Sequence, residues 1–136
     1  MNRQTIQHNL EIRVRYHETD GQGRVHHAQY LNYFERGRVE LLRSLGYSYR
    51  EFEASGLMLV VAEMQVQYLG AAEFDDLLTL TTSVVSSRRV RITHSYAIHK
   101  ASENGQPAQE IIRATSVIAC VNRLGKLQAL PNYLRH

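Results

Sequence analysis

The chain has 136 residues, of which 43% are hydrophobic and 21% charged, an ordinary balance for one globular domain with its own core. Its net charge of +3 is scattered, which suits a phosphate-bearing ligand but lacks the clustering of a nucleic-acid-binding surface. The single cysteine, Cys120, excludes an intrachain disulfide framework, and its apolar surroundings predict a buried thiol. No apolar stretch approaches the ~20 residues of a membrane span, and the start MNRQTIQHN does not resemble a signal peptide. We therefore expect a cytoplasmic protein.

The first predicted element is a strand. Hydrophobic and charged residues alternate from Leu10 to Tyr16, which is typical of a strand with one buried face. The polar residues 1–9 before it, and residues 131–136 at the other end, are predicted to be flexible. The strand leads into a loop, residues 17–27, that is rich in titratable and turn-forming side chains.

A long helix is predicted from Ala28 to Leu45. Four apolar residues recur along it at spacings of three and four, namely Leu31, Phe34, Leu41 and Leu45. Gly46 is expected to end the helix, and Gly37 is expected where the helix lies close to a sheet.

Four further strands are predicted at residues 57–69, 78–84, 90–98 and 111–121, with a short helix at 47–55, a turn at 104–107 and a tail from 124. In the first of these strands we expect one face to hold Val60, Ala62, Met64, Val66 and Tyr68. One strand, one long helix and four more strands predict an α+β domain in which an antiparallel sheet wraps around one helix.

The loop and the helix carry a recognisable pattern. It reads Y-x-x-T-D-x-x-G-x-V-x-H-x-x-Y from Tyr16 to Tyr30, followed by F-E-x-x-R from Phe34 to Arg38. This pattern closely resembles the signature of the hotdog-fold acyl-CoA thioesterases, in particular the 4-hydroxybenzoyl-CoA thioesterase and YbgC-like family. The resemblance extends from about residue 10 to residue 131. It implies a hotdog fold with five antiparallel strands around one central helix, a homodimer or homotetramer, and sites built from two chains.

Asp20 is the principal candidate for catalysis. A carboxylate in a Gly-rich loop just before a helix can attack or activate water, while free N–H groups at the helix start hold a developing negative charge. From the residues alone, Asp20 could equally be a turn or helix-capping aspartate. The resemblance places it at the catalytic position, as general base or nucleophile. Glu18 is predicted to point away to the surface or to a supporting position, and Gly21 and Gly23 to adopt positive φ and tighten the loop.

His27 matches the family's histidine at the start of the helix. The resemblance implies that the backbone N–H groups of His27 and Ala28 form the oxyanion site, and that the His27 side chain positions substrate or water; a solvent-facing histidine is the alternative. Two more histidines, His17 and His26, lie nearby, but no carboxylate or Cys completes a ligand set. We expect no metal and no redox cofactor, with CoA present only as part of the substrate.

Further substrate contacts are predicted at Gly23, at Tyr30, and at Tyr68, which either lines the acyl pocket or belongs to the core. Asn32 is a candidate for packing near the thioester. Glu63 is predicted to face solvent rather than to orient water.

Arg88 and Arg89 lie between two predicted strands. They either form a solvated turn or contact the nucleotide phosphates of CoA, because guanidinium groups pair well with phosphate.

The sequence thus predicts an acyl-CoA thioesterase that releases a free acid and CoA. An acyl-carrier-protein thioesterase and a non-enzymatic acyl-CoA-binding hotdog protein are the alternatives. The sequence does not identify the acyl group.

Overall fold

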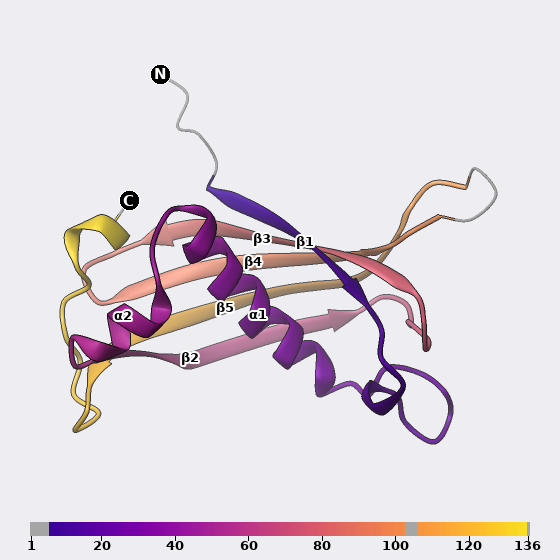
Figure 1. The fold of residues 1–136 in the computed structure, drawn as a ribbon, viewed down its shortest axis with the longest axis horizontal. Coiled ribbons are helices and arrows are strands. Elements are labelled where there is room, and N and C mark those ends of the chain that lie inside the picture. Colours follow the sequence, from indigo (N-terminus) through magenta and orange to yellow (C-terminus); the bar gives the residue numbers. More distant parts are fainter. Residues whose placement is uncertain (1–5, 103–105, 136) are drawn as a thin grey trace.

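The computed structural model describes residues 6–102 and 106–135. In chain order the elements are β1 (Gln7–Arg13), the 3₁₀ turn η1 (Tyr16–Glu18), α1 (Gln29–Ser44), α2 (Tyr49–Ala54), β2 (Leu57–Tyr68), β3 (Leu77–Ser87), β4 (Arg91–Lys100), β5 (Gln109–Asn122) and the 3₁₀ turn η2 (Asn132–Leu134). The strands form one antiparallel sheet in the order β1-β3-β4-β5-β2, and α1 lies across one face of it (Figure 1). The predicted α+β arrangement is confirmed. The turn predicted at 104–107 lies partly outside the described residues.

The core lies between α1 and the inner face of the sheet. Alternating residues of the strands and one side of the helix are buried there, including Ile12, Leu78, Leu80, Ile98 and Ile112 from the strands and Tyr33 and Phe34 from the helix. A second cluster packs against α2 and consists of Phe52, Ile92, Cys120, Leu130 and Leu134. Burial of Cys120 is as predicted, and it raises the pKa of the thiol. Leu134 belongs to the tail that we predicted to be flexible, yet its side chain is buried.

Strand β1 begins earlier than predicted. Gln7, His8 and Asn9 form ladder pairs with β3, although their polar side chains gave no strand signal. Backbone pairing does not require an apolar side chain, and one neighbour in the sheet is enough to hold an edge strand. At the other end, Tyr16 leaves the strand for η1 and is 77% exposed.

Strand β2 does not keep one alternation throughout. Its pairing with β5 skips Ala62, which forms a β-bulge, so the single inner face predicted for even-numbered residues from 60 to 68 is wrong in its first half. Met64 packs on the core as predicted, whereas Val60 is 39% exposed and Leu59 takes the inward position instead. The extra residue reverses which side chains face inward.

Helix α1 begins one residue after the predicted start and ends one residue before the predicted end. Its buried residues are Tyr30, Tyr33, Phe34, Gly37 and Leu41. Leu31 and Leu45, which we expected on this face, are 42% and 39% exposed in the single chain. Neither α-helix in the described part of the chain combines the length and the hydrophobicity of a membrane span.

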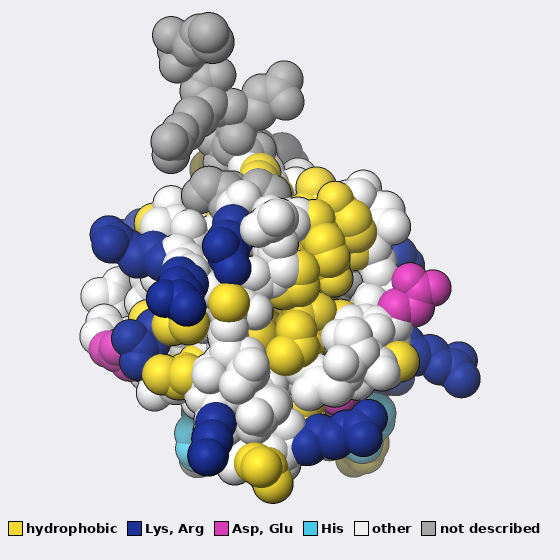
Figure 2. Space-filling model, turned by 90° about the vertical axis from the view of Figure 1, so that its left-hand side faces the viewer, with side chains coloured by type: hydrophobic (Ala, Val, Ile, Leu, Met, Phe, Trp, Pro, Cys, Tyr) yellow, Lys and Arg dark blue, Asp and Glu magenta, His cyan; other side chains and the backbone are white. Residues whose placement is uncertain are grey.

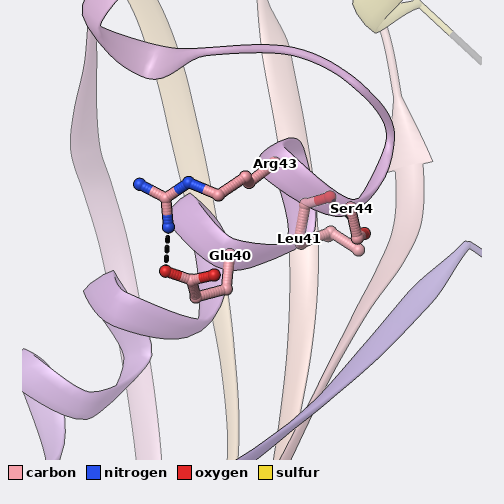
Figure 3. Close-up of polar contacts among 4 residues, drawn as sticks. All are labelled: Glu40, Leu41, Arg43 and Ser44. Atoms are coloured by element: carbon pink, nitrogen blue, oxygen red, sulfur yellow. Dashed lines mark hydrogen bonds and ion pairs between the residues drawn. The ribbon is translucent and has the colours of Figure 1, made fainter.

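The end of α1 is closed as the sequence indicates. Gly46 has φ +89°, its N–H donates to the Arg43 carbonyl (3.0 Å), and the next N–H, of Tyr47, donates to the Leu42 carbonyl (3.0 Å). This is the Schellman arrangement, which satisfies carbonyls at a helix end. In the last turn, Arg43 also forms an ion pair with Glu40 (Figure 3). A cation here is favourable because the helix dipole is negative at this end.

Gly37 sets the distance between α1 and the sheet, and its replacement tests that contact. A Gly→Ala change inside a helix normally stabilises by about 0.5–1 kcal/mol. Here the added Cβ would overlap Thr82 Oγ1 and lie 2.8 Å from Leu80 Cδ2. We expect overpacking to win, so that Gly37→Ala lowers the free energy of unfolding by about 1–3 kcal/mol in urea denaturation. In the control Gly21→Ala the new Cβ has no atom within 4 Å, and the change should stay within about 0.5 kcal/mol. A gain in stability for Gly37→Ala would contradict the close contact.

Candidate active site

The loop of residues 19–25 closes on itself just before α1. An isolated antiparallel bridge joins its ends, Asp20 N–H donates to the Arg24 carbonyl (2.7 Å), and Gly23 N–H donates to the Asp20 carbonyl (3.0 Å). Gly23 has φ +80°, as predicted, because this turn needs the left-handed region. Gly21 was predicted to share this conformation, but its φ is not positive. The loop is held by its own backbone.

The Asp20 side chain is exposed, and one of its oxygens is already engaged. Oδ1 accepts hydrogen bonds from the N–H groups of Gln22 (2.8 Å) and Arg24 (3.3 Å). The Gln22 bond, with help from the Arg24 amide and from the charges of His26 and Arg24, holds the pKa of Asp20 below its ordinary value. Asp20 is therefore a turn aspartate in geometry and an ionised carboxylate at neutral pH. Its second oxygen, Oδ2, accepts no hydrogen bond from the described residues.

The two amides predicted for the oxyanion site are not equivalent. Ala28 N–H donates to Nδ1 of His26 at 3.2 Å, a long bond that a ligand oxygen can replace. His27 N–H has no acceptor among the described residues. The imidazoles of His26 and His27 stack with their centroids 4.3 Å apart. The role of His26 as the partner of Ala28 was missed, because an i to i+2 side-chain contact has no signal in residue spacing.

Glu18 takes the second of its two predicted places, the surface or a supporting position. Its side chain is only 6% exposed. Its Oε1 accepts from Arg15 N–H (2.7 Å) and Tyr33 OH (2.9 Å), and its Oε2 accepts from Gln29 Nε2 (3.1 Å). Only the surface alternative is wrong, because three donors surround the Glu18 carboxylate and compensate its burial. Burial, together with Glu18, raises the pKa of the Tyr33 phenol.

Two tyrosines connect β2 to the site. Tyr68 is half exposed, and its OH donates to the His27 carbonyl at 2.9 Å, so it reaches the loop rather than forming part of the core. Tyr30 is 3% exposed and packs edge-on against Tyr68, with ring centroids 5.9 Å apart. Asn32 is exposed and donates to Gln29 Oε1 (3.2 Å). Of the predicted contacts, Gly23 forms a backbone hydrogen bond with Asp20, and the Tyr68 hydroxyl forms a hydrogen bond with His27.

Arg88 and Arg89 are not part of this cluster. The β3–β4 connection that carries them lies at the opposite end of the sheet from the Asp20 loop (Figure 1). The exposed Arg88 lines a pocket on the outer face of the sheet with Arg91 and Glu63, and the Arg89 carbonyl accepts from Leu130 N–H (2.8 Å). Glu63 faces solvent, as predicted. Within one chain, a small ligand at Asp20 does not reach these arginines.

No group of three His, Cys, Asp or Glu side chains in residues 6–102 and 106–135 is arranged to hold a metal ion.

Comparison with known proteins identifies the family of the chain. The model of the thioesterase-like superfamily matches residues 14–135, a stretch that contains the loop, α1 and all strands but β1. The chain belongs to this superfamily, and it is a thioester hydrolase.

Three known proteins show how close the similarity is. The chain is 33% identical over 121 residues to the acyl-CoA thioester hydrolase YbgC of Escherichia coli O6:H1, covering 88% of this chain and 87% of YbgC. A probable thioesterase from Bartonella henselae has a crystal structure that matches with a TM-score of 0.80 and 34% identity, covering 92% of this chain and 99% of that chain. The 4-hydroxybenzoyl-CoA thioesterase of Pseudomonas sp. strain CBS-3 has the same fold, with a TM-score of 0.80 at 17% identity, over 93% of both chains. The hotdog fold is confirmed.

Removal of the buried carboxylate should show how strongly it holds the site. Glu18→Ala would leave the Tyr33 hydroxyl and the Arg15 amide without their acceptor. We expect a loss of about 2–3 kcal/mol in the free energy of unfolding, measured by urea denaturation, because unpartnered buried donors carry their full desolvation cost. The exposed Glu11 of β1 offers a matched control, and Glu11→Ala should change stability by less than about 0.5 kcal/mol. Equal losses in the two variants would contradict the anchoring role.

Proposed function

We propose that this thioester hydrolase acts on acyl-CoA and releases a free carboxylic acid and CoA, with Asp20 as its catalytic carboxylate. The main support is the geometry of the Asp20 loop, in which an exposed, ionised carboxylate lies just before the start of α1 with one oxygen engaged and the other without a donor among the described residues. The name of the YbgC relative supports the substrate class. A location in the cytoplasm remains a prediction from the sequence.

The chemistry needs little from the protein. A thioester carbonyl is reactive and a thiolate is a good leaving group, so an oriented nucleophile and an oxyanion site are sufficient. In the nucleophilic route, Asp20 attacks the carbonyl carbon, CoA leaves as the thiolate, and water hydrolyses the resulting mixed anhydride. In the alternative route, Asp20 takes a proton from the attacking water. The lowered pKa of Asp20 favours the nucleophilic route, because a general base works best with a pKa near the operating pH. Neither route requires a metal or a redox cofactor.

The proposed oxyanion donors are the N–H groups of His27 and Ala28. They lie just before the first turn of α1, where the helix dipole favours negative charge. When the oxyanion forms, Ala28 N–H exchanges its long bond to His26 Nδ1 for a bond to charged oxygen, which is the stronger interaction. Tyr68, through its bond to the His27 carbonyl, holds the peptide that carries the Ala28 N–H.

We further propose that the working form is a homodimer or homotetramer. Strand β2 is a twelve-residue edge strand that exposes Val61 and Tyr68, and α1 exposes Leu31. Unpaired edges of this length and apolar character are normally covered in native proteins. Because the Asp20 loop and Arg88 lie at opposite ends of the sheet within one chain, a site that uses both would take them from two chains.

Sedimentation velocity at micromolar concentration tests the assembly. We expect a species of at least twice the 15.6 kDa chain mass. Replacement of Val61 by Lys on the proposed contact should shift the equilibrium towards the monomer, while Glu11→Lys, on the opposite edge strand, should leave the assembly intact. A wild-type protein that sediments as a monomer would rule out a two-chain site.

Asp20→Asn tests the catalytic role, because it keeps the shape of the side chain and removes its charge. We expect kcat to fall by roughly 10² or more while substrate binding largely survives. Asp75→Asn is a suitable control, since Asp75 is an exposed turn residue with φ 71°, a conformation that Asn also accepts. Near-normal turnover by folded Asp20→Asn would reject both routes.

The pH profile and isotope labelling separate the two routes. With the pKa of Asp20 below its ordinary value, kcat/KM should not fall between neutral pH and about pH 5 through this group, whereas a base tuned towards neutrality would produce an acid limb there. In single-turnover hydrolysis in ¹⁸O-labelled water, attack by Asp20 followed by water attack on the Asp20 carbonyl carbon of the anhydride places an unlabelled carboxylate oxygen in the acid and the label in Asp20. Direct attack by water labels the acid at once.

We propose that Arg88 and Arg89 contact the phosphates of CoA. Arg88→Ala together with Arg89→Ala should raise KM for acyl-CoA by roughly tenfold with little change in kcat, because phosphate contacts stabilise the ground and transition states alike. A thioester that lacks the nucleotide should be hydrolysed as before. Equal losses with both substrates would contradict the phosphate contact, and activity confined to a carrier-protein thioester would favour the alternative substrate.

A further inference from the structure

A pocket that no part of the proposed mechanism uses lies between the second half of α1, α2 and the inner face of the sheet. Its volume is about 290 Å³, and its walls are mainly aliphatic, with Leu42, Leu45, Leu59, Val84, Ile92 and Leu134 among them. Hydrophobic side chains gather at this end of the molecule, with Lys and Arg side chains around them (Figure 2). The Asp20 loop precedes α1, so the helix separates the two sites within one chain.

A positively charged side chain lines this apolar pocket. Arg38, on α1, is half-buried and lines it, and its Nη1 donates to Tyr96 OH (2.9 Å), which in turn shares a hydrogen bond with Ser116 Oγ (2.6 Å). No carboxylate in the described part of the chain forms an ion pair with Arg38. A guanidinium has five N–H donors. Arg38 therefore brings a positive charge and unused donors into an aliphatic environment, where an unpaired charge is costly.

A second polar group lines the same pocket. His94 is 5% exposed, and its Nδ1 has no hydrogen-bond partner among the described residues. Burial, together with the charge of Arg38, lowers the pKa of His94 to about 4, so the imidazole is neutral near pH 7. The remaining charged side chain of the lining is the exposed carboxylate of Glu35. The buried part of the pocket thus combines one cation with one neutral imidazole that lacks a partner.

We propose that this pocket binds an aliphatic carboxylate of medium length, with its carboxylate on Arg38 and its chain among the leucines. Arginine pairs with a carboxylate through two parallel hydrogen bonds, and the aliphatic walls favour an alkyl chain. A cavity of about 290 Å³ is far larger than the space of one water molecule, roughly 30 Å³, and octanoate is a suitable medium-length probe for it. If the proposed function holds, such an acid belongs to the class of product that the enzyme releases, and the pocket is a site for product binding.

Calorimetric titration of the full chain with octanoate near pH 7.5 tests the proposal, with octan-1-ol as the uncharged comparison. We expect one octanoate per chain and binding at least about tenfold weaker for the alcohol, because a charge-assisted pair is worth about 1.5–3 kcal/mol. Arg38→Gln should weaken octanoate to the level of the alcohol. Arg36→Gln, on the exposed side of α1, is the matched control and should bind as the wild type does.

Two further variants keep the test decisive. Leu45 is 39% exposed at the pocket, so Leu45→Trp should fold and should block octanoate even where Arg38→Gln does not fold. Asp20→Asn should bind octanoate unchanged while it loses hydrolysis, which separates this proposal from the proposed function. No octanoate binding, equal binding of acid and alcohol, or loss of binding in Asp20→Asn would each overturn the proposal.

Discussion

A buried carboxylate is expensive unless donors surround it, and at Glu18 three donors converge. They come from Arg15, which lies between β1 and η1, and from Gln29 and Tyr33 in the first two turns of α1. These three hydrogen bonds therefore fix the position of the loop between these elements, which carries Asp20. The exposed carboxylate of Asp20 thus follows a buried, fully hydrogen-bonded one by two residues.

The periodic elements could be predicted from the sequence because their signal is local. Phe34 and Leu41 mark the buried side of α1, and Gly37 and Gly46 mark its approach to the sheet and its end. Features that depend on a partner strand could not be predicted. The ladder at Gln7 is made of backbone bonds, which no side-chain pattern reveals.

The candidate site was predictable as a set of residues but only partly as an arrangement. Asp20, Gly23 and His27 do lie on one loop before α1, as the resemblance implied. The burial of Glu18 could not be predicted because it depends on donors from α1, Gln29 and Tyr33, which lie 11 and 15 residues further along the chain. The pocket beside Arg38 and His94 was missed as well, since it is formed by residues about 56 positions apart in the chain, and only the sheet topology brings them together.

The bulge at Ala62 determines which side chains of β2 face α1 on either side of it. The positions of Leu59 and Tyr68 differ by an odd number, so in an uninterrupted strand the two side chains would face opposite sides of the sheet. The unpaired residue between them returns both to the side of α1, where Leu59 lines the aliphatic pocket and Tyr68 holds the His27 peptide. A single inserted residue thus lets one strand line the pocket at one end of the molecule and bind the His27 carbonyl at the other. Deleting Ala62 would turn either Leu59 or Tyr68 to the opposite face of the sheet, and one of these two contacts would be lost.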